Sequence, residues 1–219
     1  MPEAVILDLD GVLLDSEQRW NQIKEAFVRE TGGRWRAEAP RAMMGMSSTE
    51  WSAYLHDSLG VPMDPESINR EVASRMQTSY ARELPLLPGA PEAVRVLAAR
   101  WPLGLASSSN REIIDRFLEL ADLSREFRVT ISSEEVARGK PAPDVYREAA
   151  RRLEVDPARC VAVEDSSNGI RAATAAGMTV IAVPNADYPP EDEALELATA
   201  RVAGIGDVTP ALVERIGRN

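Results

Sequence analysis

AVILDLDGVLLD, at residues 4–15, is the stretch that decides the fold. Its four leading residues are all apolar, which is typical of a strand buried on both faces of a parallel sheet. Asp8, Asp10 and Gly11 follow, so carboxylates stand where that strand ends. Ligands and catalytic groups gather at the carboxyl ends of strands in open α/β sheets. The stretch therefore predicts an α/β fold with a polar site at the end of its first strand.

Further apolar runs of strand length recur along the chain, and most are separated by segments with helical periodicity. The apolar runs lie at residues 103–106, 127–131, 160–163 and 178–183. The helical segments lie at residues 91–99, 112–120, 144–153 and 170–176. Continuous apolar strands that alternate with helices indicate a parallel sheet covered on both faces. We therefore predict a doubly wound, Rossmann-like core with a mostly parallel sheet.

The interval from residue 16 to residue 85 breaks this alternation. Its apolar residues recur at helical spacing, and it contains no convincing strand. Ser47 and Glu50 have the spacing of a capping box at the start of a helix. We therefore predict an all-helical cap domain over residues 16–85, inserted into a core domain formed by residues 1–15 and 86–219.

Composition restricts the partners of this chain. Its 219 residues include 25 basic and 35 acidic ones, for a net charge of −10. This balance argues against nucleic acid and anionic membranes as partners. The single cysteine, Cys160, and the absence of a visible targeting segment lead us to expect a cytoplasmic protein, and we expect a monomer. Only two of the basic residues, Lys24 and Lys140, are lysines.

Polar residues also follow or flank the later strands. Ser107 and Ser108 follow the second run, Lys140 stands between Gly139 and a proline, and Glu164 and Asp165 follow the run at 160–163. Any one of these residues alone is common in turns and helix caps. Because the carboxyl ends of parallel strands meet at one edge, we expect them to form one site together with the aspartates of the first strand.

Phosphoryl transfer needs this set of groups. Asp8 and Asp165 offer the oxygen ligands that Mg²⁺ prefers. Asp8 stands where a carboxylate nucleophile would attack phosphorus, and Asp10 where a group would protonate the leaving oxygen and then activate water. Ser107, the backbone N–H groups after it and Lys140 would hold the phosphoryl oxygens.

Four motifs resemble those of the haloacid dehalogenase-like hydrolase superfamily, in particular its β-phosphoglucomutase-like branch of phosphatases. They are DLDGVLLDSE at residues 8–17, LASSS at 105–109, GKPAPDVY at 139–146 and VEDSSNGI at 163–170. The resemblance implies an aspartyl-phosphate enzyme whose helical cap closes over the site and selects the substrate. It covers the whole chain and is weakest at residues 32–82 and after residue 188.

The resemblance also assigns roles to individual residues. It implies Asp8 as nucleophile and Asp10 as general acid and base. Mg²⁺ would be bound by Asp8, the backbone carbonyl of Asp10 and Asp165, with Glu164 close by or acting through water. The phosphoryl group would be bound by Ser107, Ser108 and Lys140. The loop formed by Gly45, Met46 and Ser47 would approach the active site from the cap and contribute to specificity.

Three other activities compete with a simple phosphatase. Dehalogenases of this superfamily lack the second aspartate, so Asp10 favours phosphate ester chemistry. A phosphosugar mutase needs cap residues for a second phosphate, and Ser48, Met76 and Trp20 stand where such an enzyme carries an arginine, a lysine and a histidine. A non-catalytic phosphate-binding protein of the same fold is the third alternative. We expect a Mg²⁺-dependent phosphatase of a small phosphorylated metabolite, a sugar or polyol monophosphate.

Overall fold

The computed structural model describes residues 1–185 and 188–217. Within them lies one six-stranded sheet in the order β3-β2-β1-β4-β5-β6, and all its neighbouring strands pair in parallel. The strands are β1 Ala4–Leu7, β2 Leu103–Ser107, β3 Phe127–Ser132, β4 Cys160–Glu164, β5 Thr179–Ala182 and β6 Ala200–Arg201. The predicted fold class is therefore confirmed. Strand β6, which contains only two residues, was not among the strands predicted from the sequence.

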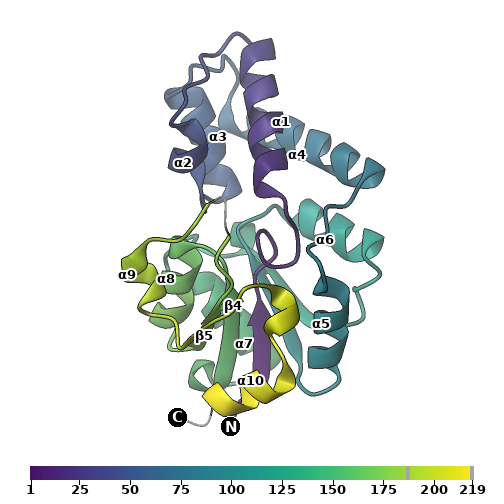
Figure 1. Ribbon diagram of the computed structural model, residues 1–219. Coiled ribbons are helices and arrows are strands. Elements are labelled where there is room, and N and C mark those ends of the chain that lie inside the picture. The colour runs from purple at the N-terminus through teal and green to yellow at the C-terminus, as the bar shows by residue number, and fades with distance from the viewer. Residues whose placement is uncertain (186–187, 218–219) are drawn as a thin grey trace.

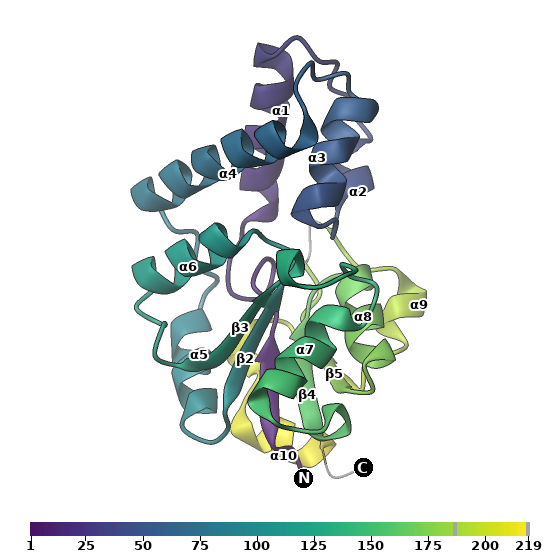
Figure 2. The same cartoon turned by 180° about the vertical axis from the view of Figure 1, so that it is seen from behind.

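Ten α-helices surround or extend this sheet in the described part of the chain (Figures 1 and 2). They are α1 Glu17–Glu30, α2 Ala39–Met43, α3 Ser48–Asp57, α4 Pro65–Arg82, α5 Ala90–Ala98, α6 Arg111–Leu120, α7 Asp144–Leu153, α8 Ser167–Ala175, α9 Asp192–Leu195 and α10 Pro210–Ile216. Short 3-10 turns lie at Ser133–Glu135, Pro157–Arg159 and Ile205–Asp207. Across residues 1–185 and 188–217, every helix is too short or too polar to cross a membrane.

The central strand β1 shows why both faces of the sheet are covered. Its side chains alternate between two apolar clusters, because successive residues of a strand point to opposite faces. Val5 and Leu7 belong to the cluster that also contains the apolar sides of α5, α6 and α10. Ala4 and Ile6 belong to the cluster that contains those of α7 and α8. All four side chains of β1 are fully buried, which explains its uninterrupted apolar sequence.

Helices α1 to α4 stand together beyond the carboxyl end of β1, away from the chain termini (Figure 1). The two chain segments that join them to the sheet run side by side: Leu14 pairs with Leu86, and the Asp15 N–H donates to Pro85 O at 2.8 Å. The capping box predicted at Ser47 is present, with Glu50 as its partner. These helices hold the position expected for a cap, while its boundaries at residues 16 and 85 stay a prediction.

Candidate active site

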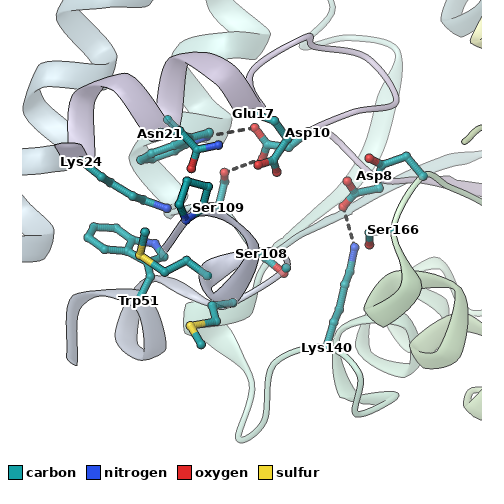
Figure 3. A pocket seen from close by; sticks show the side chains of 16 residues that line it. Asp8, Asp10, Glu17, Asn21, Lys24, Trp51, Ser108, Ser109, Lys140 and Ser166 are labelled. Atoms are coloured by element: carbon teal, nitrogen blue, oxygen red, sulfur yellow. Dashed lines mark hydrogen bonds and ion pairs between the residues drawn. The ribbon is translucent and has the colours of Figure 1, made fainter. Parts of the chain in front are cut away.

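A pocket lies between the carboxyl edge of the sheet and helices α1 to α3 (Figure 3). The sheet side contributes groups that follow β1, β2 and β4, because parallel strands end at one edge. The helical side contributes residues from α1, α3 and the segment between them. The lining residues are Asp8, Asp10, Glu17, Trp20, Asn21, Lys24, Pro40, Met43, Gly45, Met46, Trp51, Ser108, Ser109, Lys140, Asp165 and Ser166.

Lys140 connects the ends of three strands at the floor of this pocket. Its ammonium donates to Asp8 Oδ1 at 2.5 Å, to Glu164 Oε1 at 2.5 Å and to the Ala106 carbonyl at 3.0 Å. The side chain is only 3% exposed. Burial works to lower the pKa of Lys140, but the two carboxylates outweigh it and hold that pKa above its ordinary value. Lys140 is therefore a fixed positive charge beside the Asp8 carboxylate.

Glu164 is fully buried, and hydrogen bonds hold both of its carboxylate oxygens. Oε1 accepts from Lys140 and, at 2.7 Å, from the Tyr146 hydroxyl. Oε2 accepts from the backbone N–H of Asp165 at 3.1 Å. A Cβ at Gly169 would come within 1.9 Å of the Glu164 carboxylate, so only glycine leaves room for it. These contacts fit a carboxylate that positions Lys140.

Asp8, Glu164 and Asp165 bring carboxylate oxygens within 4.8 Å of one another. With Lys140 as the one ammonium bonded to them, this cluster is acidic. Burial raises the pKa of Asp8 to about 8 and that of Asp165 well above its ordinary value. The Asp165 carboxylate accepts no hydrogen bond from any residue that the structure describes, and it lines the pocket. A buried, partly unsatisfied set of hard oxygen donors fits a divalent cation such as Mg²⁺.

Gly11 leaves space for this acidic cluster. Its φ of +81° suits glycine, and a Cβ there would lie 1.9 Å from Asp165 Oδ2. The glycine that follows the two aspartates in the sequence thus allows the chain to turn directly against Asp165.

The Asp10 carboxylate lies apart from the acidic cluster (Figure 3). It accepts hydrogen bonds from Ser16 Oγ at 2.5 Å, Trp20 Nε1 at 3.2 Å and Ser109 Oγ at 2.6 Å. The side chains of Asp8 and Asp10 therefore line different parts of one pocket. The resemblance implied a metal contact through the Asp10 backbone carbonyl, and that contact stays a prediction.

Ser107 and Ser108, at the end of β2, differ in what their hydroxyls contact. Ser107 is fully buried, and its Oγ accepts from the backbone N–H of Ser109 at 2.9 Å, so it shapes the turn. Ser108 lines the pocket, and its buried hydroxyl has no hydrogen-bond partner among residues 1–185 and 188–217. Of the two predicted phosphate-binding serines, Ser108 is the one with a free hydroxyl at the pocket.

The structure distributes the three predicted specificity residues unequally. Gly45 and Met46 line the pocket. Gly45 has a φ of +73°, and a Cβ there would meet the Asn168 amide at 3.0 Å. The Ser47 hydroxyl instead donates to Glu50 Oε2 at 2.7 Å, within the capping box at the start of α3. Ser47 is absent from the pocket lining.

Sequence reasoning assigned no role to several residues that the structure brings to the site. Tyr146 was part of a quoted motif, and only its position on α7 reveals its bond to Glu164. Glu17, Asn21 and Lys24 line the pocket from one side of α1. Their spacing of four and three residues is the available sequence signal, because it places all three on one helical face.

Known proteins have sequences similar to this one. The sequence model of the haloacid dehalogenase-like hydrolases matches residues 5–183. Hexitol phosphatase B of Escherichia coli strain K12 is 34% identical over 212 residues, which cover 94% of each protein. The bifunctional riboflavin kinase/FMN phosphatase of Arabidopsis thaliana is 32% identical over 187 residues, or 84% of this chain. The chain spans about half of that longer protein, with 49% of it covered.

Solved structures share the fold. The crystal structure of CbbY from Rhodobacter sphaeroides in complex with phosphate superposes with a TM-score of 0.85 at 26% identity, covering 98% of this chain and 100% of that one. The β-phosphoglucomutase of Clostridium difficile gives a TM-score of 0.85 at 21% identity, covering 99% and 97%. The second likeness, at so low an identity, concerns the fold alone.

Proposed function

Since the chain belongs to the haloacid dehalogenase-like hydrolase family, as its motifs predicted, we propose that it is a Mg²⁺-dependent phosphatase of a small phosphorylated metabolite. We propose a sugar or polyol monophosphate as the substrate class. Relatives named as a hexitol phosphatase and a phosphorylated carbohydrates phosphatase, the latter 33% identical over 178 residues, support this substrate class. The observation that carries the proposal is the meeting of Asp8, Lys140 and Asp165 at one pocket.

In the proposed first step, an oxygen of Asp8 attacks phosphorus and the bond between phosphorus and the ester oxygen breaks. The product is an aspartyl-phosphate, and the alcohol leaves after it receives a proton. Lys140, fixed 2.5 Å from Asp8, would stabilise negative charge on the phosphoryl oxygens. The unpartnered Ser108 hydroxyl supplies a further donor for those oxygens.

Asp10 is the group that would carry the proton. It would give one to the leaving oxygen in the first step and take one from the attacking water in the second. Three hydrogen bonds hold the Asp10 carboxylate at the pocket wall, apart from Asp8. To reach the leaving oxygen it has to turn toward Asp8, and we expect this movement when substrate binds. Water then attacks phosphorus, which releases inorganic phosphate and restores the Asp8 carboxylate.

Asp8 and Asp165 are the residues that would bind Mg²⁺ directly, with Glu164 beside them. A bound divalent cation would supply the positive charge that keeps these buried carboxylates ionised and that offsets the charge of the phosphoryl group. Ionised Asp8 is the form that acts as a nucleophile.

Two positions of the cap, Ser48 and Met76, favour a phosphatase over a phosphosugar mutase. The Ser48 hydroxyl is buried and donates to Glu134 Oε1 at 2.9 Å, so its partner is an acidic side chain. Met76 is fully buried and apolar. At these two positions the structure therefore offers no positive charge for a second phosphate of a bisphosphate intermediate.

Release of p-nitrophenol from p-nitrophenyl phosphate tests the proposal. We expect hydrolysis with Mg²⁺, none after EDTA treatment, and none with Asp8→Asn in either condition. A phosphosugar mutase would instead need a sugar bisphosphate as activator, and a binding protein would show no turnover. Full Mg²⁺-dependent activity in Asp8→Asn would contradict the assignment of the nucleophile.

A further inference from the structure

Lys24 is a buried cation on the cap side of the pocket. It lies on α1, is only 6% exposed and lines the same pocket as Asp8 and Lys140. Figure 3 shows its ammonium directed into the space between α1 and Trp51. It is one of only two lysines in the chain, and Lys140 is the other.

Two tryptophan rings flank the Lys24 ammonium. The nitrogen lies 5.2 Å from the centre of the Trp20 ring and 4.8 Å from that of Trp51. The ring centres are 6.1 Å apart, with planes inclined at 50°. Aromatic faces attract cations, but they neither neutralise the charge nor accept conventional hydrogen bonds from the ammonium. The rings therefore fix the position of the ammonium and leave its donors available.

Those donors have no partner among residues 1–185 and 188–217, where the ammonium makes neither a hydrogen bond nor an ion pair. Burial lowers the pKa of Lys24 to about 8, while the charges of Glu17 and Asp10 raise it only in part. Burial of an ammonium without hydrogen bonds costs free energy. The other buried lysine, Lys140, is stabilised by two carboxylates, and Lys24 has no such partner among the described residues.

We propose that Lys24, between Trp20 and Trp51, binds a second anionic group of the substrate. The substrate would then be a phosphate monoester with a carboxylate or second phosphate at the far end of its carbon chain. This inference rests on the proposed phosphatase function and changes the expected substrate from a plain sugar or polyol monophosphate to one that carries a second anionic group. A carboxylate and a phosphate share the chemistry that this site requires, because both are oxyanions that accept hydrogen bonds from the ammonium.

Lys24 and the proposed phosphoryl site belong to the same pocket. Lys24 lines it from α1, and Asp8 and Lys140 line it from the sheet side. An oxyanion at the end of the substrate opposite the scissile phosphate would therefore contact Lys24 while that phosphate lies beside Asp8.

The test compares six-carbon phosphate esters that differ in the group far from the scissile phosphate. Sorbitol 6-phosphate has a neutral far end, 6-phosphogluconate has a carboxylate there, and fructose 1,6-bisphosphate has a second phosphate. A hydrogen-bonded charge pair contributes about 1.5–3 kcal/mol, so we expect kcat/KM to favour an anionic substrate about 10- to 100-fold. A larger gain in kcat/KM for 6-phosphogluconate identifies the oxyanion as a carboxylate, and a larger gain for fructose 1,6-bisphosphate identifies it as a phosphate.

Variants of Lys24 assign that preference. We expect Lys24→Met to bring the ratio of kcat/KM values close to one and Lys24→Arg to retain most of it. Arg29→Gln removes the same charge from the exposed side of α1, where the Arg29 side chain is 67% exposed, and should leave the ratio unchanged. Equal use of neutral and anionic substrates by the wild-type enzyme would overturn the inference, as would an equal loss for both with Lys24→Met.

Calorimetric binding to the Asp8→Asn variant gives a readout independent of turnover. In that background 6-phosphogluconate or fructose 1,6-bisphosphate should bind more tightly than sorbitol 6-phosphate, and addition of Lys24→Met should remove the difference. Equal affinities would overturn the inference. Failure of the proposed function shows itself differently, as absence of Mg²⁺-dependent hydrolysis of p-nitrophenyl phosphate by the wild-type enzyme.

Discussion

Replacement of Lys140 by methionine tests how the acidic cluster is held together. The change keeps an unbranched side chain of similar length and removes the charge. It deletes the bonds to Asp8 and Glu164, each 2.5 Å long, and the bond to the Ala106 carbonyl. Three buried carboxyl groups then remain within 4.8 Å of one another without their ammonium.

The magnitude follows from the burial of both partners. The Lys140 and Glu164 side chains are 3% and 0% exposed, so solvent cannot replace the lost charge. Removal of one partner of a buried ion pair costs about 3–5 kcal/mol. Loss of a fixed donor to the reacting oxygens lowers kcat by about 10²- to 10³-fold. We expect Lys140→Met to lose both stability and turnover by these amounts.

Urea unfolding followed by tryptophan fluorescence measures the first effect, and p-nitrophenyl phosphate hydrolysis the second. Arg138→Gln is the matched control, because Arg138 lies two residues away, is 68% exposed and pairs with Asp144 at 2.8 Å. An exposed pair contributes no more than about 1 kcal/mol. If Lys140→Met were as stable in EDTA as Arg138→Gln, the reasoning about the buried cluster would be refuted.

Two further predictions concern the same cluster. Tyr146→Phe should destabilise the protein by about 1.5–3 kcal/mol, because it removes a 2.7 Å hydrogen bond to a buried carboxylate; urea unfolding within 0.5 kcal/mol of wild type would contradict this. The pKa of Asp8 rises from 3.8 to about 8 on folding, so in EDTA the folded chain holds a proton on Asp8 that the unfolded chain has lost between these pH values. The free energy of unfolding of the wild type, relative to that of Asp8→Asn, should therefore fall as pH rises through this window. The fall is at most about 1.4 kcal/mol per pH unit. Saturating Mg²⁺ should reduce the fall, and a relative stability that rises from pH 5 to 8 in EDTA would disprove the sign.

The core of the fold could be predicted because its strands are continuous apolar runs. β1 is buried on both faces, so four apolar residues in succession have one simple explanation. β6 offers no such pattern, since it consists only of Ala200 and Arg201, one small and one charged residue that pair with β5. A strand of two residues depends on where the chain returns to the sheet, and that is a property of the whole fold.

The same distinction applies to the site. Asp8 and Asp165 follow strands directly, so parallel pairing alone brings them to one edge of the sheet. Tyr146 and Lys24 lie on helices, where packing decides which neighbour a side chain meets. The different contacts of the Ser107 and Ser108 hydroxyls could not be predicted from the sequence either. They depend on the turn after β2, in which Ser107 Oγ accepts a hydrogen bond and Ser108 Oγ, at the pocket, has no partner among the described residues.

The most direct measurement traps the covalent intermediate. Asp10→Asn removes the group that we propose activates water, so the aspartyl-phosphate should accumulate after it forms slowly. Acid quenching during turnover with Mg²⁺, followed by mass spectrometry of the N-terminal peptide, should find one phosphoryl group on Asp8, and none in the double variant with Asp8→Asn. A phosphoryl group on another residue, or turnover of this variant at the wild-type rate with none bound, would contradict the assignment of Asp8 as the nucleophile.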